Sequence, residues 1–228
     1  MGKIIAFVHA KGTSERVPSK NLKLLGDKPL FYYAVNNALN SSMVDEVIID
    51  SDSDDILSLG KNFGAVPLKR PAELATNLAT GDDLAYWQAS NRQNSTVVLQ
   101  VIPTAPFIKS SSIDNAITLL LENDVDSVAG CAKDSFYLWN DGKPSYYVNG
   151  KIPNSKDLKP LLYETTGLYI NKTQSVLKNK RRLNPQSCLP YILSKLETVD
   201  INTPEDFEFA ELLFKGLEYK NSDFNIKE

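Results

Sequence analysis

Short apolar segments alternate along this chain with segments of helical periodicity, and that alternation restricts the fold more than any other feature. The candidate strands are Ile4–Val8, Val47–Ile49, Thr96–Ile102, Ser127–Cys131 and Tyr163–Ile170. Between most of them, apolar residues recur three and four positions apart, which is the spacing of one helix face. Strands joined through helices need crossover connections, so we predict an α/β fold with a mostly parallel sheet flanked by helices.

Residues that favour helix ends delimit the predicted helices. The first helix is expected over Pro29–Leu39, because proline suits the first helical turn. The last is expected after Thr203, which can cap it, with Pro204 in its first turn. The candidate first residues or caps of the helices between are Ser53, Asp82 or Asp83, and Ser111 or Ser112.

Residues 136–162 interrupt the alternation. Two turn clusters, Asn140–Gly142 and Asn149–Gly150, flank the aromatic stretch Ser145–Val148, which indicates a β-hairpin. Composition alone leaves two interpretations open: an excursion packed on its own chain, or an arm that reaches a second subunit. We otherwise expect a single domain over residues 1–228, with a disordered polar tail at 220–228.

Charge and length exclude several classes of protein. The chain has 25 Lys and Arg against 28 Asp and Glu, so we expect it to bind neither nucleic acid nor an anionic membrane. No apolar run approaches the roughly 20 residues of a membrane span. The apolar run at the N-terminus is too short for a secretory signal. We therefore expect a soluble cytoplasmic protein.

Side chains that usually bind metals or attack substrates are scarce. Cys131 and Cys188 lack the spacing of a metal site or of a disulfide framework. His9 is the single histidine, which excludes a histidine-rich metal site and leaves one residue for any Ser-His-Asp triad. Phosphate and carboxylate chemistry remain open.

The segment His9–Asn21, directly after the first predicted strand, concentrates groups that bind phosphate. Gly12 permits a tight turn whose N–H groups can face an anion, and Thr13 and Ser14 add hydroxyl donors. Three cations lie close together in this otherwise acidic chain: Lys11, Arg16 and Lys20. The pattern is neither a P-loop nor the dinucleotide-binding glycine motif. A solvated basic loop is the alternative interpretation.

This segment resembles the signature A-R-G-G-S-x-x-x-x-x-K-N of the acylneuraminate cytidylyltransferases, also called CMP-sialic acid synthetases. Lys11 stands where the family has Arg, and Glu15, where Lys is common, is expected to point away from the phosphates. The resemblance implies that this loop binds the nucleotide. The implied nucleotide-binding residues are Lys11, Gly12, Thr13, Ser14, Arg16, Lys20 and, near the base and ribose, Asn21.

The segment Lys69–Asp83 resembles the family's R-P-x-x-L-A-x-D-x-A. The resemblance implies that Arg70 and the backbone at Thr80 and Gly81 contact cytidine. Asn77 replaces the usual Asp and is given no role. A polar loop leading to a helix cap is the alternative interpretation of this segment.

Two further segments resemble the family's substrate side. Residues 99–107 resemble L-Q-P-T-S-P-L, although the glutamine lies two residues upstream of its usual place, and residues 163–169 resemble the strand beside the sugar. The candidate substrate contacts are Gln100, Thr104, Glu164 and Thr166. Prolines that end a strand, and ordinary strand alternation, are the alternative explanations.

Asp200 and Asn202 precede the last predicted helix and share one face of an extended segment, so both can address one ion. The family has Asp-x-Asp here, which implies a Mg²⁺ site with Asp200 as the main carboxylate and Asn202 as a second ligand. Capping of the helix by Asn202 or Thr203 is the alternative. The acidic cluster Asp50–Asp55 is interpreted as a helix cap and a solvated turn, with Asp52 as a candidate contact.

The resemblance extends from Ile4 to about Ala210 and implies a Rossmann-like nucleotidyltransferase fold. It implies that CTP reacts with an acidic 2-keto sugar of the sialic acid type to give a CMP-sugar and pyrophosphate. Mg²⁺ is then the cofactor, and the partners are CTP, the acidic sugar and a second subunit contacted by the arm. The candidate catalytic residues are Lys11, Arg16, Lys20 and Asp200.

Three alternatives stay open from the sequence. The sugar could be an octulosonate, as in a CMP-octulosonate synthetase, because only pocket chemistry separates such acids. A nucleotidyltransferase could use another base or a sugar phosphate. A non-catalytic nucleotide-binding module would bind CTP without releasing pyrophosphate.

Overall fold

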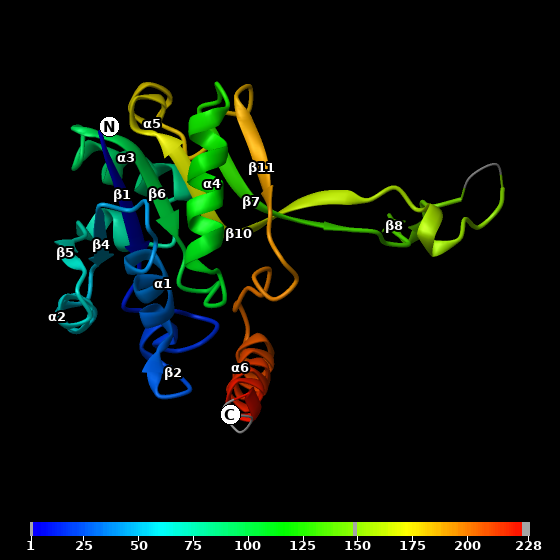
Figure 1. Cartoon of the computed structure of the whole chain (residues 1–228), viewed down its shortest axis with the longest axis horizontal. Helices are drawn as coiled ribbons and strands as arrows, with labels where there is room; N and C mark the ends of the chain where they lie inside the picture. Colours follow the sequence, from blue (N-terminus) through cyan, green and yellow to red (C-terminus); the bar gives the residue numbers. More distant parts are fainter. Residues whose placement is uncertain (1, 148–149, 225–228) are drawn as a thin grey trace.

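A seven-stranded sheet runs through the centre of the molecule in the computed structural model, which describes residues 2–147 and 150–224 (Figure 1). The strand order is β11-β7-β10-β6-β1-β4-β5. The strands are β1 (Lys3–His9), β4 (Glu46–Ser51), β5 (Val66–Lys69), β6 (Ser95–Val101), β7 (Ser127–Asp134), β10 (Leu161–Lys172) and β11 (Cys188–Ile192). Only β10 runs antiparallel to its neighbours in this sheet, so the predicted mostly parallel α/β sheet is confirmed.

Helices cover both faces of the sheet. Residues of β1 alternate between two cores: Val8 packs with α1, α2 and α4, and Phe7 packs with α3 and α5. Because both faces are covered, the central strands are apolar throughout, as the sequence shows for β1. The helices are α1 (Leu30–Leu39), α2 (Asp54–Asn62), α3 (Gly81–Ser90), α4 (Ser110–Glu122) and α5 (Thr173–Asn179).

The helix starts agree with the sequence only in part. Ser53 caps α2, as predicted, by accepting a hydrogen bond from the backbone N–H of Ile56. The helix α3 begins before Asp82 and is capped by Thr80. The predicted serine cap of α4 is wrong, because Lys109 takes the cap position without a side-chain hydrogen bond and the serines lie inside the first turn.

Two strands that the sequence did not predict lie at the two edges of the sheet. Each contains a proline, Pro67 in β5 and Pro190 in β11. Proline lacks the N–H that a central strand needs, so a sequence pattern containing it argues against a strand. An edge strand tolerates proline because one of its sides has no partner strand, which is why these two segments still pair with the sheet.

Residues 135–147 and 150–160, between β7 and β10, form the projecting arm seen in Figure 1. A small hairpin of β8 (Trp139–Asn140) and β9 (Lys143–Pro144) turns through Asp141 and Gly142, both with positive φ. A 3₁₀ turn follows at Ser155–Asp157. The second predicted turn cluster begins at residue 149, which lies outside the described residues.

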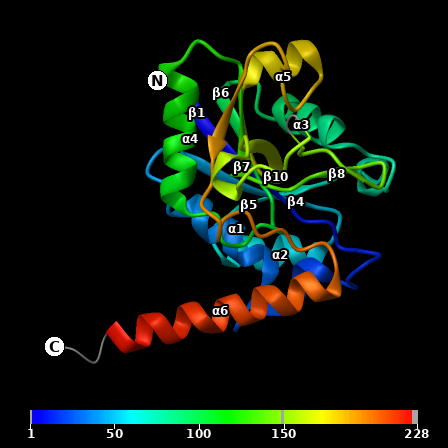
Figure 2. The same ribbon diagram turned by 90° about the vertical axis from the view of Figure 1, so that its right-hand side faces the viewer.

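The last helix, α6 (Pro204–Phe224), crosses the base of the molecule (Figure 2). Phe207 and Ala210 are buried against residues of the short hairpin β2 (Leu24–Leu25) and β3 (Lys28–Pro29) and of α1. The helix continues through Phe224, and so overlaps the first residues of the tail predicted at 220–228. In the described parts of the chain, no helix has the length and apolarity to cross a membrane.

Thr203 caps α6 as the sequence predicts. Its hydroxyl accepts a hydrogen bond from the N–H of Asp206 (3.2 Å), and Asp206 Oδ2 accepts in return from the N–H of Thr203 (2.8 Å). We predict that Thr203→Ala lowers the free energy of unfolding by about 1 kcal/mol in urea denaturation. Ser111→Ala, in the first turn of α4, is the control, and an equal loss in both variants would contradict this role.

Candidate active site

A cavity of about 400 Å³ opens at the carboxyl ends of β1, β5 and β6. Its walls come from residues 9–21, from residues 70–84 and from the segment 102–104 that follows β6. Ligands of open α/β sheets bind at this end of the strands. The loop after β1, the Arg70 segment and Thr104 therefore meet in one place although they lie far apart in the sequence.

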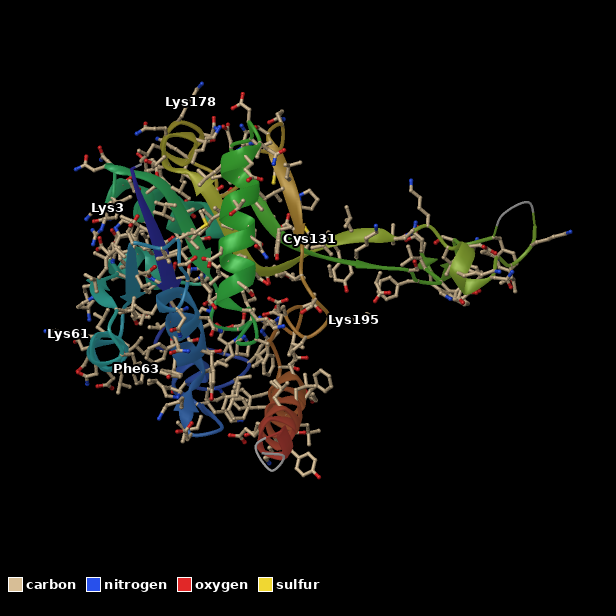
Figure 3. All side chains as sticks on the ribbon, in the orientation of Figure 1. Lys3, Lys61, Phe63, Cys131, Lys178 and Lys195 are labelled. Carbon is tan, nitrogen blue, oxygen red and sulfur yellow. The ribbon has the colours of Figure 1, made fainter. Side chains whose placement is uncertain are left out.

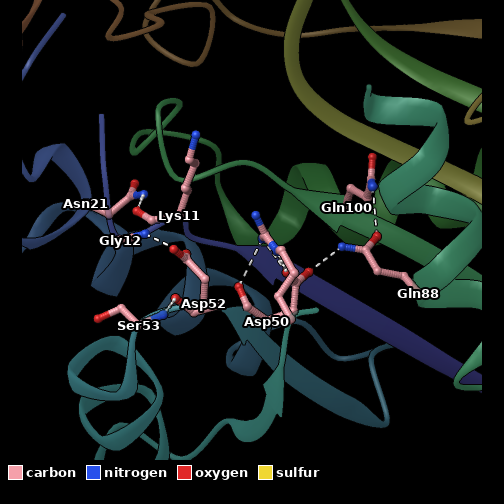
Figure 4. A network of polar contacts seen from close by, with 10 residues as sticks. Lys11, Gly12, Asn21, Asp50, Asp52, Ser53, Gln88 and Gln100 are labelled. Atoms are coloured by element: carbon pink, nitrogen blue, oxygen red, sulfur yellow. Dashed lines mark hydrogen bonds and ion pairs between the residues drawn. The ribbon is translucent and has the colours of Figure 1, made fainter. Parts of the chain in front are cut away.

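The loop after β1 is pinned by two hydrogen bonds. Asn21 Nδ2 donates to the carbonyl oxygen of Lys11 (2.8 Å), and Asp52 Oδ1 accepts from the N–H of Gly12 (2.8 Å; Figure 4). A Cβ at Gly12 would lie 2.9 Å from the Cβ of Ser53, so glycine allows the close approach. The N–H of Gly12 thus already faces an anionic group of the protein itself, the carboxylate of Asp52.

The three cations of this loop meet neutral acceptors. Lys11 Nζ donates to Asn77 Oδ1 (2.6 Å) and Lys20 Nζ donates to the carbonyl oxygen of Ile201 (2.7 Å). Arg16 Nη2 donates to Asn202 Oδ1 (3.0 Å). Among the described residues, none of the three cations forms an ion pair with a carboxylate. No described ion pair therefore neutralises their charge at the cavity.

Burial and charge together perturb Lys20. Burial lowers the pKa of its ammonium group, the nearby Asp200 carboxylate raises it, and Arg16 lowers it again. Burial is the largest of these effects, and the charge of Arg16 adds to it. An anion bound beside Lys20 would oppose both effects.

Asp200 lies beside these cations with one oxygen unsatisfied. Its Oδ2 accepts hydrogen bonds from Asn202 Nδ2 (2.5 Å) and from Thr166 Oγ1 (3.3 Å). Its Oδ1 is buried and has no hydrogen-bond partner among the described residues. A buried carboxylate oxygen without a partner is costly, and a bound cation would satisfy it. The oxygen of Asn202 is instead engaged by Arg16.

Arg70 forms part of the cavity wall and is almost completely buried. Its Nε donates to Asp50 Oδ1 (2.6 Å), and its Nη2 contacts the same carboxylate and the carbonyl oxygen of Asp50. Burial raises the pKa of Asp50, and Arg70 opposes that rise. Asp50 thus belongs to a buried ion pair, in place of the solvated acidic turn that the sequence predicted.

Among the other predicted contacts, Thr104 lines the cavity, whereas Thr80, Gly81, Glu164 and Gln100 do not. Thr80 is engaged in capping α3, and Gly81 lies against the guanidinium of Arg182. Glu164 accepts a hydrogen bond from the hydroxyl of Tyr169 (3.0 Å). The side chain of Gln100 points into the interior and bonds to Gln88 Oε1, so the structure does not bring it to the cavity.

Two cavity residues were misjudged from sequence. Asn77, which was given no role, accepts from Lys11 and donates to Glu15, and all three line the cavity. Glu15, which was expected to point away, therefore faces the site. A single sequence holds no signal for such cross-loop pairs. The polar residues of segment 70–84 indicated only that this loop lies near a ligand.

Comparison with known proteins decides the family. The cytidylyltransferase family model matches residues 5–214. The chain belongs to the cytidylyltransferase family. The predicted resemblance and the assignment as an enzyme are thereby confirmed.

Relatives of similar length support this assignment. This cytidylyltransferase is 28% identical to the pseudaminic acid cytidylyltransferase of Campylobacter jejuni (strain 81-176), with 93% of this chain and 97% of the relative covered. It is 29% identical to the CMP-N,N'-diacetyllegionaminic acid synthase of Legionella pneumophila, with the same coverage of 93% and 97%. A solved structure of a CMP:2-keto-3-deoxy-manno-octonic acid synthetase complexed with CTP matches with a TM-score of 0.70 at 15% identity, covering 94% of this chain and 99% of that one, which shows the shared fold.

His9 supplies a test of cavity burial. Burial, together with Arg70 and Arg182, lowers the pKa of His9 from 6.5 to about 3. Below the unfolded pKa, only the unfolded chain gains this proton, so His9 makes stability fall as the pH falls toward about 3. We predict that wild type loses about 1–2 kcal/mol more than His9→Gln between about pH 7 and pH 5 in urea denaturation. Equal losses would contradict the lowered pKa of His9.

Proposed function

We propose that this cytidylyltransferase joins CMP from CTP to an acidic 2-keto sugar and releases pyrophosphate. The supporting observation is uncompensated charge on both sides of the site. Lys11, Arg16 and Lys20 have only neutral acceptors, and Asp200 Oδ1 has no partner in the described chain. A nucleoside triphosphate with a divalent ion supplies anions for the former and a cation for the latter.

The loop residues hold the triphosphate in this proposal. Lys11 and Arg16 exchange their amide acceptors for phosphate oxygens, because hydrogen bonds between charged groups are stronger. Ser14 and Thr13 line the same cavity and add hydroxyl donors. The anomeric hydroxyl of the sugar attacks the α-phosphorus as the bond to the β-phosphate oxygen breaks. Lys20 and the two other cations stabilise the departing pyrophosphate.

Asp200 is the residue that would hold Mg²⁺. The ion prefers a small number of protein oxygens, with phosphates and waters completing its coordination, and the unpaired Oδ1 of Asp200 fits that preference. Bound there, Mg²⁺ would neutralise charge that builds on the α-phosphate and on pyrophosphate. Asn202 could contribute its oxygen only after releasing Arg16.

Arg70 is proposed to contact the cytosine base. Two of its guanidinium nitrogens are bound to Asp50, and the third, Nη1, has no hydrogen bond within the described residues. Since Arg70 forms part of the cavity wall, Nη1 is the nitrogen left to serve a ligand. Cytosine offers two neighbouring acceptors, O2 and N3, to such a donor.

We propose a nonulosonic acid as the sugar. The relatives with nearly full coverage are named for pseudaminic acid and for diacetyllegionaminic acid. An N-acylneuraminate cytidylyltransferase of Escherichia coli is 30% identical, covering 91% of this chain and 51% of the relative. Thr104 and Thr166 are proposed to face the sugar, since one lines the cavity and the other bonds to Asp200. An octulosonic acid is the second candidate, favoured only by fold.

Pyrophosphate release tests this function. We expect release with CTP, Mg²⁺ and one member of a panel of keto-sugar acids, and none with chelator or when ATP or GTP replaces CTP. Asp200→Asn should lower kcat by about 100-fold or more, because it removes the charge that would hold the ion. Asp55→Asn, on the exposed start of α2, is the matched control.

A measurement of nucleotide binding distinguishes the possible reasons for a negative result in this assay. Tight CTP binding without pyrophosphate release for any acid would favour a non-catalytic module. No binding of any nucleotide would overturn the proposed function. Unchanged turnover in Asp200→Asn would show that Asp200 does not hold the metal ion, and would leave the rest of the proposed function standing.

We propose that the arm of residues 136–162 joins two subunits. Large apolar side chains are exposed along it, including Trp139 (65%) and Ile152 (61%). Figure 3 shows that the arm with its side chains stands apart from the body. Exposed apolar groups on a projecting segment favour burial against a partner, and a second copy has the same arm to offer.

Sedimentation tests the homodimer. We predict that wild type sediments at twice the 25.3 kDa of one chain, and that the double variant Trp139→Ser, Ile152→Ser sediments at 25.3 kDa. Leu78→Ser, at a residue that is 89% exposed outside the arm, is the control and should remain dimeric. A monomeric wild type at micromolar concentration would disprove this arrangement.

A further inference from the structure

A continuous chain of buried hydrogen bonds links β6 to Arg70 (Figure 4). Gln100 Nε2 donates to Gln88 Oε1 (2.8 Å), and Gln88 Nε2 donates to Asp50 Oδ2 (2.5 Å). The other oxygen of Asp50 accepts from Arg70. The exposed fractions of Gln100, Gln88, Asp50 and Arg70 are 3%, 1%, 0% and 4%. Three elements, β6, α3 and β4, thus contribute to fixing one arginine that follows β5.

The direction of every bond in this chain follows from Asp50. An ionised carboxylate only accepts, so Gln88 must turn its amide nitrogen to Asp50 and its oxygen to Gln100. Gln100 must then donate in turn, which leaves its own Oε1 buried with no partner in the described residues. Both oxygens of Asp50, at the Arg70 end of this series of hydrogen bonds, therefore have partners, whereas Gln100 Oε1 at the other end has none among the described residues.

Stability alone does not explain such an arrangement. Burying an ion pair and two amides costs desolvation energy, and apolar side chains of the same volume stabilise a core at least as well. The neighbouring residues on this face, Ala85, Ala89 and Val98, form an ordinary apolar cluster. What the polar chain adds is a single orientation for the guanidinium of Arg70, which forms part of the cavity wall.

We propose that Asp50, Gln88 and Gln100 are positioning residues that fix Arg70 for recognition of the pyrimidine base. This inference rests on the proposed function, in which Arg70 contacts cytosine. None of the three lines the main cavity, so each acts through Arg70.

A fixed arginine gives selectivity as well as affinity. Cytosine presents O2 and N3 as two acceptors, whereas uracil presents O2 as an acceptor and N3–H as a donor. The N–H groups of Nη1, on a guanidinium held in one place, therefore match the acceptors of cytosine and oppose the N3–H of uracil. A guanidinium free to move can adjust to either base, so loosening Arg70 should lower the preference for CTP over UTP.

Asp50→Asn is the decisive variant. It keeps the shape of the side chain but removes the charge, and the chain of amides can reverse because Gln100 Oε1 is free to accept. We expect the KM for CTP to rise about tenfold and the CTP/UTP ratio of kcat/KM to fall about tenfold, with kcat at saturating CTP within about threefold of wild type. Unchanged KM and selectivity would overturn the proposal.

A matched control separates positioning from a general loss of stability. Glu197 is also a buried carboxylate, and it accepts hydrogen bonds from the backbone N–H of Lys109 (3.1 Å) and from the hydroxyl of Ser194 (2.6 Å), away from the cavity. Glu197→Gln should lower the melting temperature without changing the CTP/UTP ratio. If Glu197→Gln lowers the ratio as much as Asp50→Asn, the effect is structural and the proposal fails.

A double-mutant cycle tests whether Asp50 acts through Arg70. In an Arg70→Ala background, Asp50→Asn should cause no further loss of CTP/UTP selectivity, because the group that it positions is absent. Losses that multiply would show that Asp50 acts by another route, and would overturn the proposal.

A second variant covers the case in which Asp50→Asn does not fold. Gln88→Leu keeps the volume and removes the donor to Asp50, so it should lower selectivity in the same direction by a smaller factor. Unchanged selectivity in Gln88→Leu would overturn the proposal that this chain of hydrogen bonds positions Arg70. A wild type that binds no CTP would overturn both this inference and the proposed function. A wild type that prefers CTP, with variants that keep this preference, would overturn this inference alone.

Discussion

Positive charge that no ion pair neutralises among the described residues, gathered on the loop after β1, is the constraint on which the whole site depends. Lys11, Arg16 and Lys20 would repel one another less if the loop were free to spread. The loop is not free, because Asp52 holds Gly12 at its start and Asn21 ties its end back to Lys11. The fold therefore holds these cations together, and a polyanion is the ligand that relieves the repulsion.

The topology of the sheet supplies the opposing negative group. The parallel strands β1, β5 and β6 bring their carboxyl ends to one edge, which places the basic loop beside Arg70 and Thr104. The backbone N–H of Ile201 bonds to the carbonyl oxygen of Thr104 (2.8 Å), and this bond ties the Asp200 segment to the same edge. Anchoring of α6 through Phe207 then holds that segment from the other side.

The sequence predicted the features that depend on local pattern. The central strands, the cap at Thr203 and the basic loop each follow from neighbouring residues, and the order of motifs indicated the family. Partners across the fold could not be predicted in this way. Gln100 was assigned to substrate, yet β6 alternates, so that Leu99 faces the core under α1 and α4 while Val98 and Gln100 face α3. Whether Gln100 contacts a substrate or Gln88 depends on the position of α3, which the sequence alone does not give.

Polar pairs between loops were beyond prediction for the same reason. Asn77 meets Lys11 and Glu15 only because two loops converge over the cavity, and nothing in either segment encodes the other. Asp50 was interpreted as part of a solvated turn because acidic neighbours surround it in sequence. Its side chain is buried because β4 is an inner strand of the sheet and because Asp50, near the end of β4, pairs with Arg70.

A crystal structure of this protein with CTP and Mg²⁺ tests the central claim most directly, namely that one cavity joins uncompensated cations to an unpaired carboxylate in order to bind a nucleotide. We expect the triphosphate against Lys11, Arg16 and Lys20, the ion on Asp200 Oδ1, and the base beside Arg70. A triphosphate bound elsewhere, or an ion that leaves Asp200 Oδ1 without a ligand, would contradict it.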